Sequence, residues 1–216
     1  MNQPLAYVHP QAKIARNVVI EPFTTIHNNV EIGSGTWIGS NVTIMEGARI
    51  GENCRIFPGA VISGIPQDLK FDDEETTVVI GDNVTIIEPS NLYECHLADN
   101  VFVGPFVEIQ KGVHIGARTK VQSHSFICEL VSVGEDCFIG HGVMFINDTF
   151  ADGGPTGGDA SKWKATEIGN NVSFGSNATI MPVTICDHVV IGAGSVVTKD
   201  INEPGIYAGN PCRKLR

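Results

Sequence analysis

The stretch KIARNVVIEPFTTIHNNVEIGSGTWIGSNVTIMEGARIGENCRI, from Lys13 to Ile56, places an isoleucine at every sixth position. From Ile14 to Ile62, nine isoleucines follow one another at this spacing. An amphipathic helix repeats every 3.6 residues and a strand every 2, so neither explains the pattern. A period of six is typical of short strands that form the sides of a prism, with one inward aliphatic residue per side. Three such sides make a coil of 18 residues, and successive coils stack as parallel strands about 4.8 Å apart.

The same spacing returns later, so one continuous all-β prism is predicted over residues 1–216. A second run at this spacing comprises Leu97, Val103, Ile109, Ile115, Val121, Ile127, Val133, Ile139 and Phe145. A third, looser run comprises Ile168, Phe174, Ile180, Ile185, Ile191 and Val197. The residue four positions after each aliphatic of the first run is small, as a narrow prism corner requires. Cys54 and Cys137 follow this pattern, which predicts that they pack rather than react.

Asparagine marks the predicted corners. Six asparagines lie three residues after a repeat aliphatic: Asn17, Asn29, Asn41, Asn53, Asn83 and Asn171. Asn tolerates a positive φ better than other non-Gly residues, as a sharp corner needs. Because there are so many of them, we interpret these asparagines as structural.

Composition excludes several classes of protein. The net charge of −10 argues against a nucleic acid or an anionic membrane as the main partner. No apolar run approaches the roughly 18 residues of a membrane helix, and the start of the chain lacks signal-peptide character. The six cysteines form no CxxC pair and show no zinc-ligand spacing. We therefore expect reduced thiols, no metal and a cytoplasmic protein.

Several runs resemble the hexapeptide-repeat acyltransferases: EIGSGTWIGSNV (31–42), RIGENC (49–54), EIGNNV (167–172) and VVIGAGSVVTKDI (189–201). The resemblance covers nearly the whole chain. It implies a left-handed parallel β-helix that forms a homotrimer, with donor and acceptor sites between neighbouring subunits. Periodicity alone says nothing about the handedness, and the usual preference for right-handed crossovers would have predicted the opposite hand.

The six-residue repeat is interrupted twice, at residues 63–79 and 146–166. Long loops on a repeat scaffold are often functional. A surface loop without a function is the alternative for each. Residues 1–84, which include YVHPQAKI and IPQDLKF, resemble the acyltransferase that transfers a fatty acyl chain to a UDP-linked aminosugar in lipid A synthesis. That family continues with coils bearing His residues and a helical domain, whereas this chain continues with IIEPSNLYECHL. Lipid acyl transfer is therefore a disfavoured alternative.

Residues 88–216 resemble a second family, the acetyl-CoA-dependent N-acetyltransferases of dTDP-linked 3-amino-3,6-dideoxyhexoses. The resemblance is carried by VFVGPFVEIQKGVHIGARTKVQSHSFICELVSVGEDCFIGHGVMFINDTFADGG (101–154) and SNATIMPVTICDHVVIGAGSVVTKDI (176–201). With the junction placed at residues 85–97 and the second part at 98–216, the pairing of two families suggests an engineered chimera. A natural acetyltransferase with a longer N-terminal cap is the alternative.

Three polar residues are predicted to converge where the second interruption leaves the prism. Lys111, Glu129 and Asn147 are 18 residues apart and so stack in one column, with Asp148 beside them. The resemblance implies acceptor-site roles for Glu129, Asn147 and Asp148, with Lys111 as a substrate-binding candidate. Exposed polar columns are common on such prisms, so the stacking by itself is a weak signal.

Two histidines are further candidates, His141 for catalysis and His124 for substrate binding, although a lone His on a repeat face is more often structural. His141 would meet the Asn147 site only across a subunit interface. By resemblance, Glu129 takes the place where related sugar acetyltransferases carry a His. We expect direct attack of the sugar amine on the thioester, with the CoA thiolate accepting the proton.

The acetyl-CoA site is expected in the last coils. Gly175, Ser176, Ala193 and Gly194 are small and would let backbone amides approach a pantetheine arm. The resemblance places CoA phosphates near basic residues such as Lys199, Arg213 and Lys214, whereas a solvated tail is the alternative for the last two. The sequence thus predicts a nucleotide-sugar N-acetyltransferase, and a fused β-helix without a selected activity is the other hypothesis.

Overall fold

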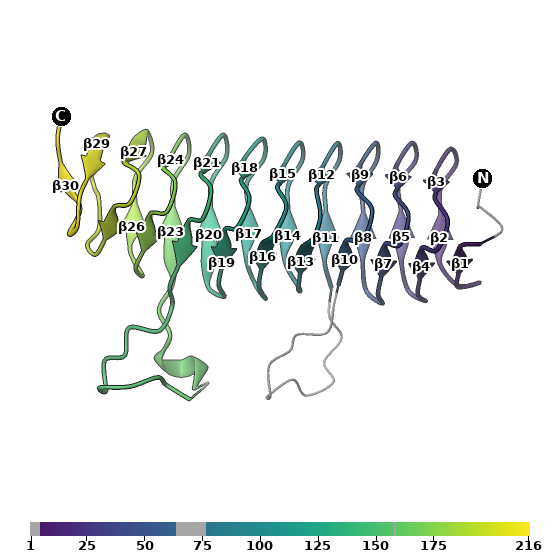
Figure 1. Ribbon diagram of the computed structural model, residues 1–216, viewed down its shortest axis with the longest axis horizontal. Helices are drawn as coiled ribbons and strands as arrows, with labels where there is room; N and C mark the ends of the chain where they lie inside the picture. Colours follow the sequence, from purple (N-terminus) through teal and green to yellow (C-terminus); the bar gives the residue numbers. More distant parts are fainter. Residues whose placement is uncertain (1–4, 64–76, 158) are drawn as a thin grey trace.

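The computed structural model describes residues 5–63, 77–157 and 159–216, and they form a long parallel β-solenoid (Figure 1). Each coil contributes one short strand to each of three sheets, which run side by side along the solenoid. A single short 3-10 helix, η1 (Ala160–Lys162), is found among the described residues. The fold is thus the all-β repeat architecture that the six-residue period predicts, as expected for a left-handed β-helix of hexapeptide repeats.

Sheet 1 has ten strands: β1 (Tyr7–Val8), β4 (Thr25–Ile26), β7 (Thr43–Ile44), β10 (Val61–Ile62), β13 (Ser90–Leu92), β16 (Val107–Ile109), β19 (Phe126–Ile127), β22 (Met144–Phe145), β25 (Thr179–Ile180) and β28 (Val196–Val197). Sheet 2 has nine: β2 (Lys13–Ile14), β5 (Glu31–Ile32), β8 (Arg49–Ile50), β11 (Val79–Ile80), β14 (His96–Leu97), β17 (His114–Ile115), β20 (Val131–Val133), β23 (Thr166–Ile168) and β26 (Thr184–Ile185).

Sheet 3 has eleven strands: β3 (Val19–Ile20), β6 (Trp37–Ile38), β9 (Arg55–Ile56), β12 (Thr85–Ile86), β15 (Phe102–Val103), β18 (Lys120–Val121), β21 (Phe138–Ile139), β24 (Ser173–Phe174), β27 (Val189–Ile191), β29 (Gly205–Ala208) and β30 (Arg213–Lys214). The last pair, β29 and β30, is antiparallel and ends the sheet. This hairpin covers a strand edge that would otherwise stay open at the C-terminal coil.

The core is a stack of aliphatic side chains, one from each side of each coil. Ile20, Ile38 and Ile56 come from successive coils, pair in register on sheet 3 and are fully buried. Backbone hydrogen bonds between coils satisfy the polar groups of these short strands, so the inward aliphatics can pack without burying an unpaired amide. Burying each such side chain stabilises the folded state by about 1.5–3 kcal/mol, so the stacked column is the main stabilising element.

The predicted corner asparagines adopt the left-handed conformation. The φ angles of Asn17, Asn29, Asn41, Asn53, Asn83 and Asn171 lie between 50° and 60°. Phe23 and Phe106 also have positive φ, which bulky residues rarely adopt, and His124 has it as well.

Strand pairing runs without a break through residues 84–97. Thr85 of β12 pairs with Phe102 of β15, and Val79 of β11 pairs with His96 of β14. These partners are one position closer in sequence than the partners in the first coils, so this coil is shorter by a single residue. Its inward side chains nevertheless stay buried. The junction of two families that we predict within 85–97 therefore coincides with a shortened coil, and its origin stays a prediction.

Candidate functional site

Both interruptions of the rhythm leave the solenoid at the same corner. We call the corner between a sheet 1 strand and the following sheet 2 strand corner 1/2, and the corner between sheet 3 and sheet 1 corner 3/1. The first interruption lies between β10 and β11, and most of it, residues 64–76, is outside the described residues. The second lies between β22 and β23 and projects from the solenoid (Figure 1). Coils built on β13, β16 and β19 lie between the two.

A column of polar side chains occupies corner 1/2 along these coils. It consists of Glu94, Lys111, Glu129 and Asn147, each two residues after an inward apolar residue of sheet 1. Lys111 Nζ lies 3.1 Å from Glu94 Oε2, and Asn147 Nδ2 donates to the backbone carbonyl of Glu129 at 3.4 Å. The structure thus stacks the three residues predicted from their regular spacing and adds Glu94 beneath them.

Sequence reasoning missed Glu94 because the shortened coil shifts it by one position from the regular count that links Lys111, Glu129 and Asn147. Its side chain is only 12% exposed, and its Oε1 is buried without a hydrogen-bond partner. A buried carboxylate oxygen that lacks a partner is rare in native proteins. Pairing with Lys111 compensates the charge of Glu94 and holds the ammonium group at corner 1/2.

Asp148 serves the second loop in the single chain. Its Oδ2 accepts a hydrogen bond from the Thr156 amide at 2.8 Å, and its Oδ1 accepts from the Phe150 amide at 2.9 Å. These two amides hold the pKa of the Asp148 carboxyl below its usual value. Asp148 therefore keeps its negative charge next to Asn147 while it fixes the path of the loop.

The rest of the second loop is ordered by its own side chains. Trp163 Nε1 donates to Thr156 Oγ1 at 2.9 Å, and Lys162 pairs with Asp152 at 2.7 Å. The Lys164 amide donates to the Asn147 carbonyl at 3.0 Å, which ties the end of the loop back to the polar column. The loop is thus built against the column from both of its ends.

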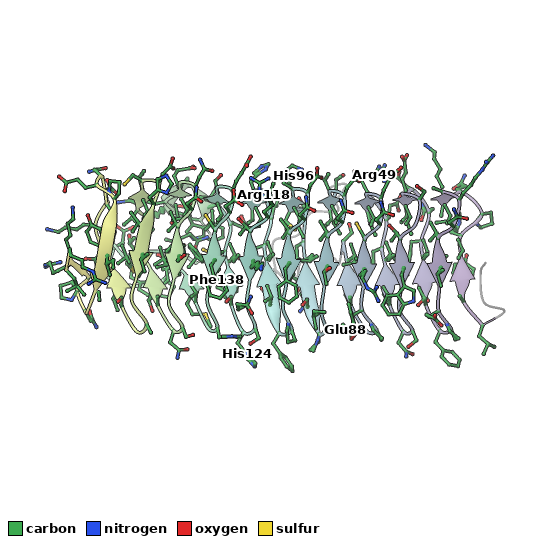
Figure 2. All side chains as sticks on the ribbon, turned by 90° about the horizontal axis from the view of Figure 1, so that it is seen from above. Arg49, Glu88, His96, Arg118, His124 and Phe138 are labelled. Atoms are coloured by element: carbon green, nitrogen blue, oxygen red, sulfur yellow. The ribbon has the colours of Figure 1, made fainter. Side chains whose placement is uncertain are left out.

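The two candidate histidines lie at corner 3/1, where the sheet 1 strands begin. His124 precedes β19, whereas Glu129 follows it, so the strand separates the two residues. Figure 2 shows His124 at the edge of the molecule opposite His96 and Arg118. His124 stacks on Phe106 with ring centroids 4.7 Å apart, and His141 Nδ1 lies 2.8 Å from Ser123 Oγ. Within one chain neither histidine meets Glu129 or Asn147.

Four of the residues predicted to hold acetyl-CoA share corner 3/1 with these histidines. Gly175 and Ser176 lie between β24 and β25, and Ala193 and Gly194 lie between β27 and β28. A Cβ added to Gly175 would come within 2.4 Å of the Ala193 amide nitrogen, so only glycine lets these coils approach. The Gly175 amide donates to Ile191 and the Gly194 amide to Ser176, so these two amides are not available to a ligand.

The three basic residues predicted to hold CoA phosphates line one cavity of about 300 Å³ at the C-terminal cap, the name we give to the hairpin of β29 and β30. Lys199, Arg213 and Lys214 border it together with Tyr207 and Thr198, and Lys214 also pairs with Glu203 at 2.8 Å. The lining does not include the four small residues of corner 3/1.

A larger cavity, of about 510 Å³, lies on sheet 2 of the first coils beside Lys13, Glu31 and Arg49. It shares no lining residue with the polar column or the C-terminal cap. We therefore locate the candidate site by the chemistry of its residues and not by the volume of a cavity.

The arrangement has one regular feature that bears on chemistry. Strands β16, β19 and β22 each begin at corner 3/1 and end at corner 1/2 beside Lys111, Glu129 and Asn147 respectively. A carboxylate and an amide at one corner can hold an amine or hydroxyl by hydrogen bonds. Within the described ranges, no three His, Cys, Asp or Glu side chains are grouped as metal ligands, and no helix there is long and apolar enough to span a membrane.

Comparison with protein families identifies the repeats. The family described as bacterial transferase hexapeptide (six repeats) matches residues 29–64 and 94–129. The hexapeptide repeat of succinyl-transferase matches residues 166–199. Together the matched segments include Lys111, Glu129 and the small residues of corner 3/1.

Curated relatives and solved structures agree with this result. The bifunctional protein GlmU of Streptococcus uberis is 37% identical over 138 residues, which cover 60% of this chain and 30% of that protein. GlmU of Lawsonia intracellularis is 35% identical over 129 residues, 59% of this chain and 26% of that protein. The chain thus spans less than a third of the length of these relatives. LpxA of Bacteroides fragilis, a UDP-N-acetylglucosamine acyltransferase, superposes with a TM-score of 0.68 at 29% identity over 99% of this chain and 73% of that one.

Proposed function

Because the chain carries the hexapeptide repeats of bacterial transferases, we propose that it is an acetyl-CoA-dependent N-acetyltransferase. Its acceptor is the amino group of a nucleotide-linked 3-amino-3,6-dideoxyhexose, with dTDP as the expected nucleotide. The observation that carries the proposal is the contact between Asn147 and Glu129, in a polar column that lies between the two interruptions of the solenoid. The LpxA relative is named for a UDP-linked aminosugar, which supports a nucleotide sugar as the acceptor class.

Glu129 and Asn147 hold the acceptor amine in the proposed site. The neutral amine nitrogen attacks the carbonyl carbon of the acetyl thioester, the C–N bond forms, and the C–S bond breaks. The proton lost from nitrogen passes to the departing thiolate, so the products are the acetamido sugar and free CoA thiol. Glu129 orients the amine in this step, and Asp148 keeps the second loop in position beside it.

The proposal requires more than one copy of the chain, because sheet 1 separates corner 3/1 from corner 1/2. A homotrimer with sheet 1 toward its threefold axis brings corner 3/1 of one copy beside corner 1/2 of the next. The outward strand residues of sheet 1 suit such a contact, since Glu108 is the only carboxylate or base among Tyr7, Thr25, Thr43, Val61, Asn91, Glu108, Phe126, Met144, Thr179 and Val196. The corresponding positions of sheet 2 include Lys13, Glu31, Arg49 and Glu167. Depletion of charge is typical of the core of a protein–protein contact.

Acetyl-CoA is held in this proposal by the small residues of corner 3/1 and by the cavity at the C-terminal cap. His141, at the same corner, faces the acetyl group from the neighbouring copy. Lys199, Arg213 and Lys214 would bind the phosphates, since they supply the positive charge around that cavity.

A second candidate is the O-acylation of a UDP-linked aminosugar from acyl carrier protein. It is favoured by the superposition on LpxA over 99% of the chain, which extends well beyond the N-terminal coils that resemble that family in sequence. A fused β-helix without a selected activity is the third candidate.

One assay separates the three candidates. Free thiol is followed while the protein is incubated with acetyl-CoA and a panel of dTDP- and UDP-linked 3-amino sugars, and in parallel with acyl carrier protein thioesters. Thiol release from acetyl-CoA with a dTDP-3-aminosugar supports the proposal. Release with acyl carrier protein and a UDP-sugar alone supports the second candidate, and a folded protein that releases no thiol with any pair supports the third.

The substitution Glu129→Gln tests the role of the carboxylate. If Glu129 only orients the amine, kcat should fall by less than about 10²-fold, while general-base catalysis typically contributes 10²–10⁴. Steady-state kinetics over a pH range provide the measurement, with Glu167→Gln, on the outward face of sheet 2, as a control for loss of one acid away from the proposed contact. Abolished kcat with unchanged acceptor binding would mean that Glu129 is an essential base, and direct transfer to the thiolate would then be wrong.

A further inference from the structure

Phe106 is an exposed aromatic residue at a strained corner. Its side chain is 57% exposed and its φ is 59°, a conformation that a bulky residue rarely adopts. Other coils place Asn41, Gly142 or Asn177 at the same corner with positive φ, residues that tolerate it. Packing in the core does not explain a phenylalanine at this position, because its ring points to solvent.

The ring of Phe106 and the ring of His124, from the next coil, together form what we call the aromatic platform. His124 stacks on Phe106 with centroids 4.7 Å apart and an interplanar angle of 25°, and His124 also has a positive φ, of 63°. Both side chains are accessible to solvent. Two nearly parallel rings at a protein surface present the kind of face on which a nucleobase stacks.

The platform lies level with the polar column. Phe106 immediately precedes β16, which ends beside Lys111, and His124 precedes β19, which ends beside Glu129. In a cyclic trimer the copies are related by rotation without translation along the axis. The platform of one copy therefore faces the coils of Lys111 and Glu129 on the next copy, one to two coils on the N-terminal side of Asn147.

We propose that Phe106 and His124 form an aromatic platform that stacks on the nucleobase of the acceptor nucleotide. The inference rests on the proposed function. The amine lies between Glu129 and Asn147 of the neighbouring copy, the diphosphate lies beside Lys111, and the base reaches Phe106. A platform of this kind binds any planar base, so it recognises the nucleotide as a class and leaves the choice of hexose to the other corner.

The test is equilibrium binding of dTDP to the intact protein without acetyl-CoA. The variant Phe106→Asn removes the ring and supplies the residue that Asn41 provides at this corner, so the corner remains compatible with its φ. Phe106→Trp keeps a stacking face. Phe23→Asn is the matched control, since Phe23 is also exposed, by 62%, and has a φ of 64° at the same corner of an N-terminal coil.

We expect Phe106→Asn to weaken dTDP binding at least about tenfold, equivalent to about 1.4 kcal/mol, while Phe106→Trp and Phe23→Asn bind as the wild type does. The affinity for inorganic pyrophosphate, which has no base, should be the same in all four proteins. Unchanged dTDP binding in Phe106→Asn overturns the platform, as does an equal loss in Phe23→Asn. A loss that coincides with dissociation of the oligomer in sedimentation velocity also overturns it. The binding test contains no acyl donor and is therefore independent of activity. A protein that binds dTDP but releases no thiol in the separate acetyl-CoA assay would reject the proposed function and leave the platform in place.

Discussion

At the scale of single residues, the prism interior changes the chemistry of its cysteines. All six cysteines are free thiols, and Cys54, Cys95, Cys128 and Cys137 are buried among the inward aliphatics. Burial raises the pKa of Cys95 and of Cys128 to about 12, because the thiolate would lose its hydration inside the prism. These thiols act as small apolar side chains and not as nucleophiles, as the repeat predicts for Cys54 and Cys137.

Their raised pKa predicts a loss of stability in alkali. Between about pH 9 and pH 12 the unfolded thiols lose their protons while the folded ones retain them, so the free energy of unfolding falls as pH rises. Each thiol contributes a slope of about 1.4 kcal/mol per pH unit in this window. Urea unfolding at pH 8, 9, 10 and 10.5 measures it, and the double variant Cys95→Ala, Cys128→Ala should show a shallower dependence. Equal slopes in the two proteins would contradict the prediction, since the other titrating groups are common to both.

At the scale of elements, the carboxylate of Asp148 fixes the start of the second loop. Asp148 accepts hydrogen bonds from the amides of Phe150 and Thr156, and the loop then returns through η1 to β23. A role for Asp148 in the acceptor site can therefore be indirect, through the position of the loop. The two amides lower the pKa of its carboxyl, so its charge persists to a lower pH than that of an ordinary aspartate.

Asp148→Asn should loosen this loop without unfolding the solenoid. The substituted amide is a weaker acceptor and can offer only one oxygen, so the Phe150 and Thr156 amides lose protection. Hydrogen exchange measured over peptides covering 147–165 should rise, while exchange in the coils around β16 stays the same. Asp152→Asn is the control, because Asp152 lies in the same loop and pairs with Lys162. Equal protection in Asp148→Asn and the wild type would show that the loop does not depend on this carboxylate.

At the scale of the whole molecule, sheets 1 and 2 present faces of different character. The outward residues of sheet 1 are nearly free of charge, whereas those of sheet 2 include acids, bases and the contacting pair His96 and His114. The proposed acceptor and donor groups lie at corner 1/2 and corner 3/1, at the two ends of the sheet 1 strands. In the proposed trimer, a contact through this face would complete the site and leave the charged face of sheet 2 in solvent.

Thr43→Lys on sheet 1 should dissociate the proposed trimer, because three added charges would be brought together near its axis without partners. The matched control is Ser132→Lys, which adds the same charge at an outward position of sheet 2. Sedimentation velocity measures the assembly, and thiol release measures activity. We expect Thr43→Lys to give monomers with at least about a tenfold loss of activity, and Ser132→Lys to remain trimeric and active. A trimeric Thr43→Lys protein would mean that a different face forms the contact.

Much of the fold was predictable because each coil repeats one local rule. The isoleucine spacing predicts which side chains point inward, and the asparagines predict where the backbone turns with positive φ. The positions of Lys111, Glu129 and Asn147 in one column also follow from spacing alone. Glu94 and Phe106 were not predicted, because the shortened coil breaks the count at Glu94 and no pattern marks Phe106 as more than a corner residue.

The sequence by itself determined the period, the inward face and the corners of this protein, since these depend on contacts that recur with every strand and every coil. Only the tertiary structure decided which distant residues share a corner. The shortened coil sets the phase between the first and second halves, so it fixes Glu94 beneath Lys111 and leaves both interruptions at corner 1/2. Which corner a residue occupies is set by the accumulated length of every coil before it, whereas the separation of His124 from Glu129 is local, because strand β19 lies between them in the sequence.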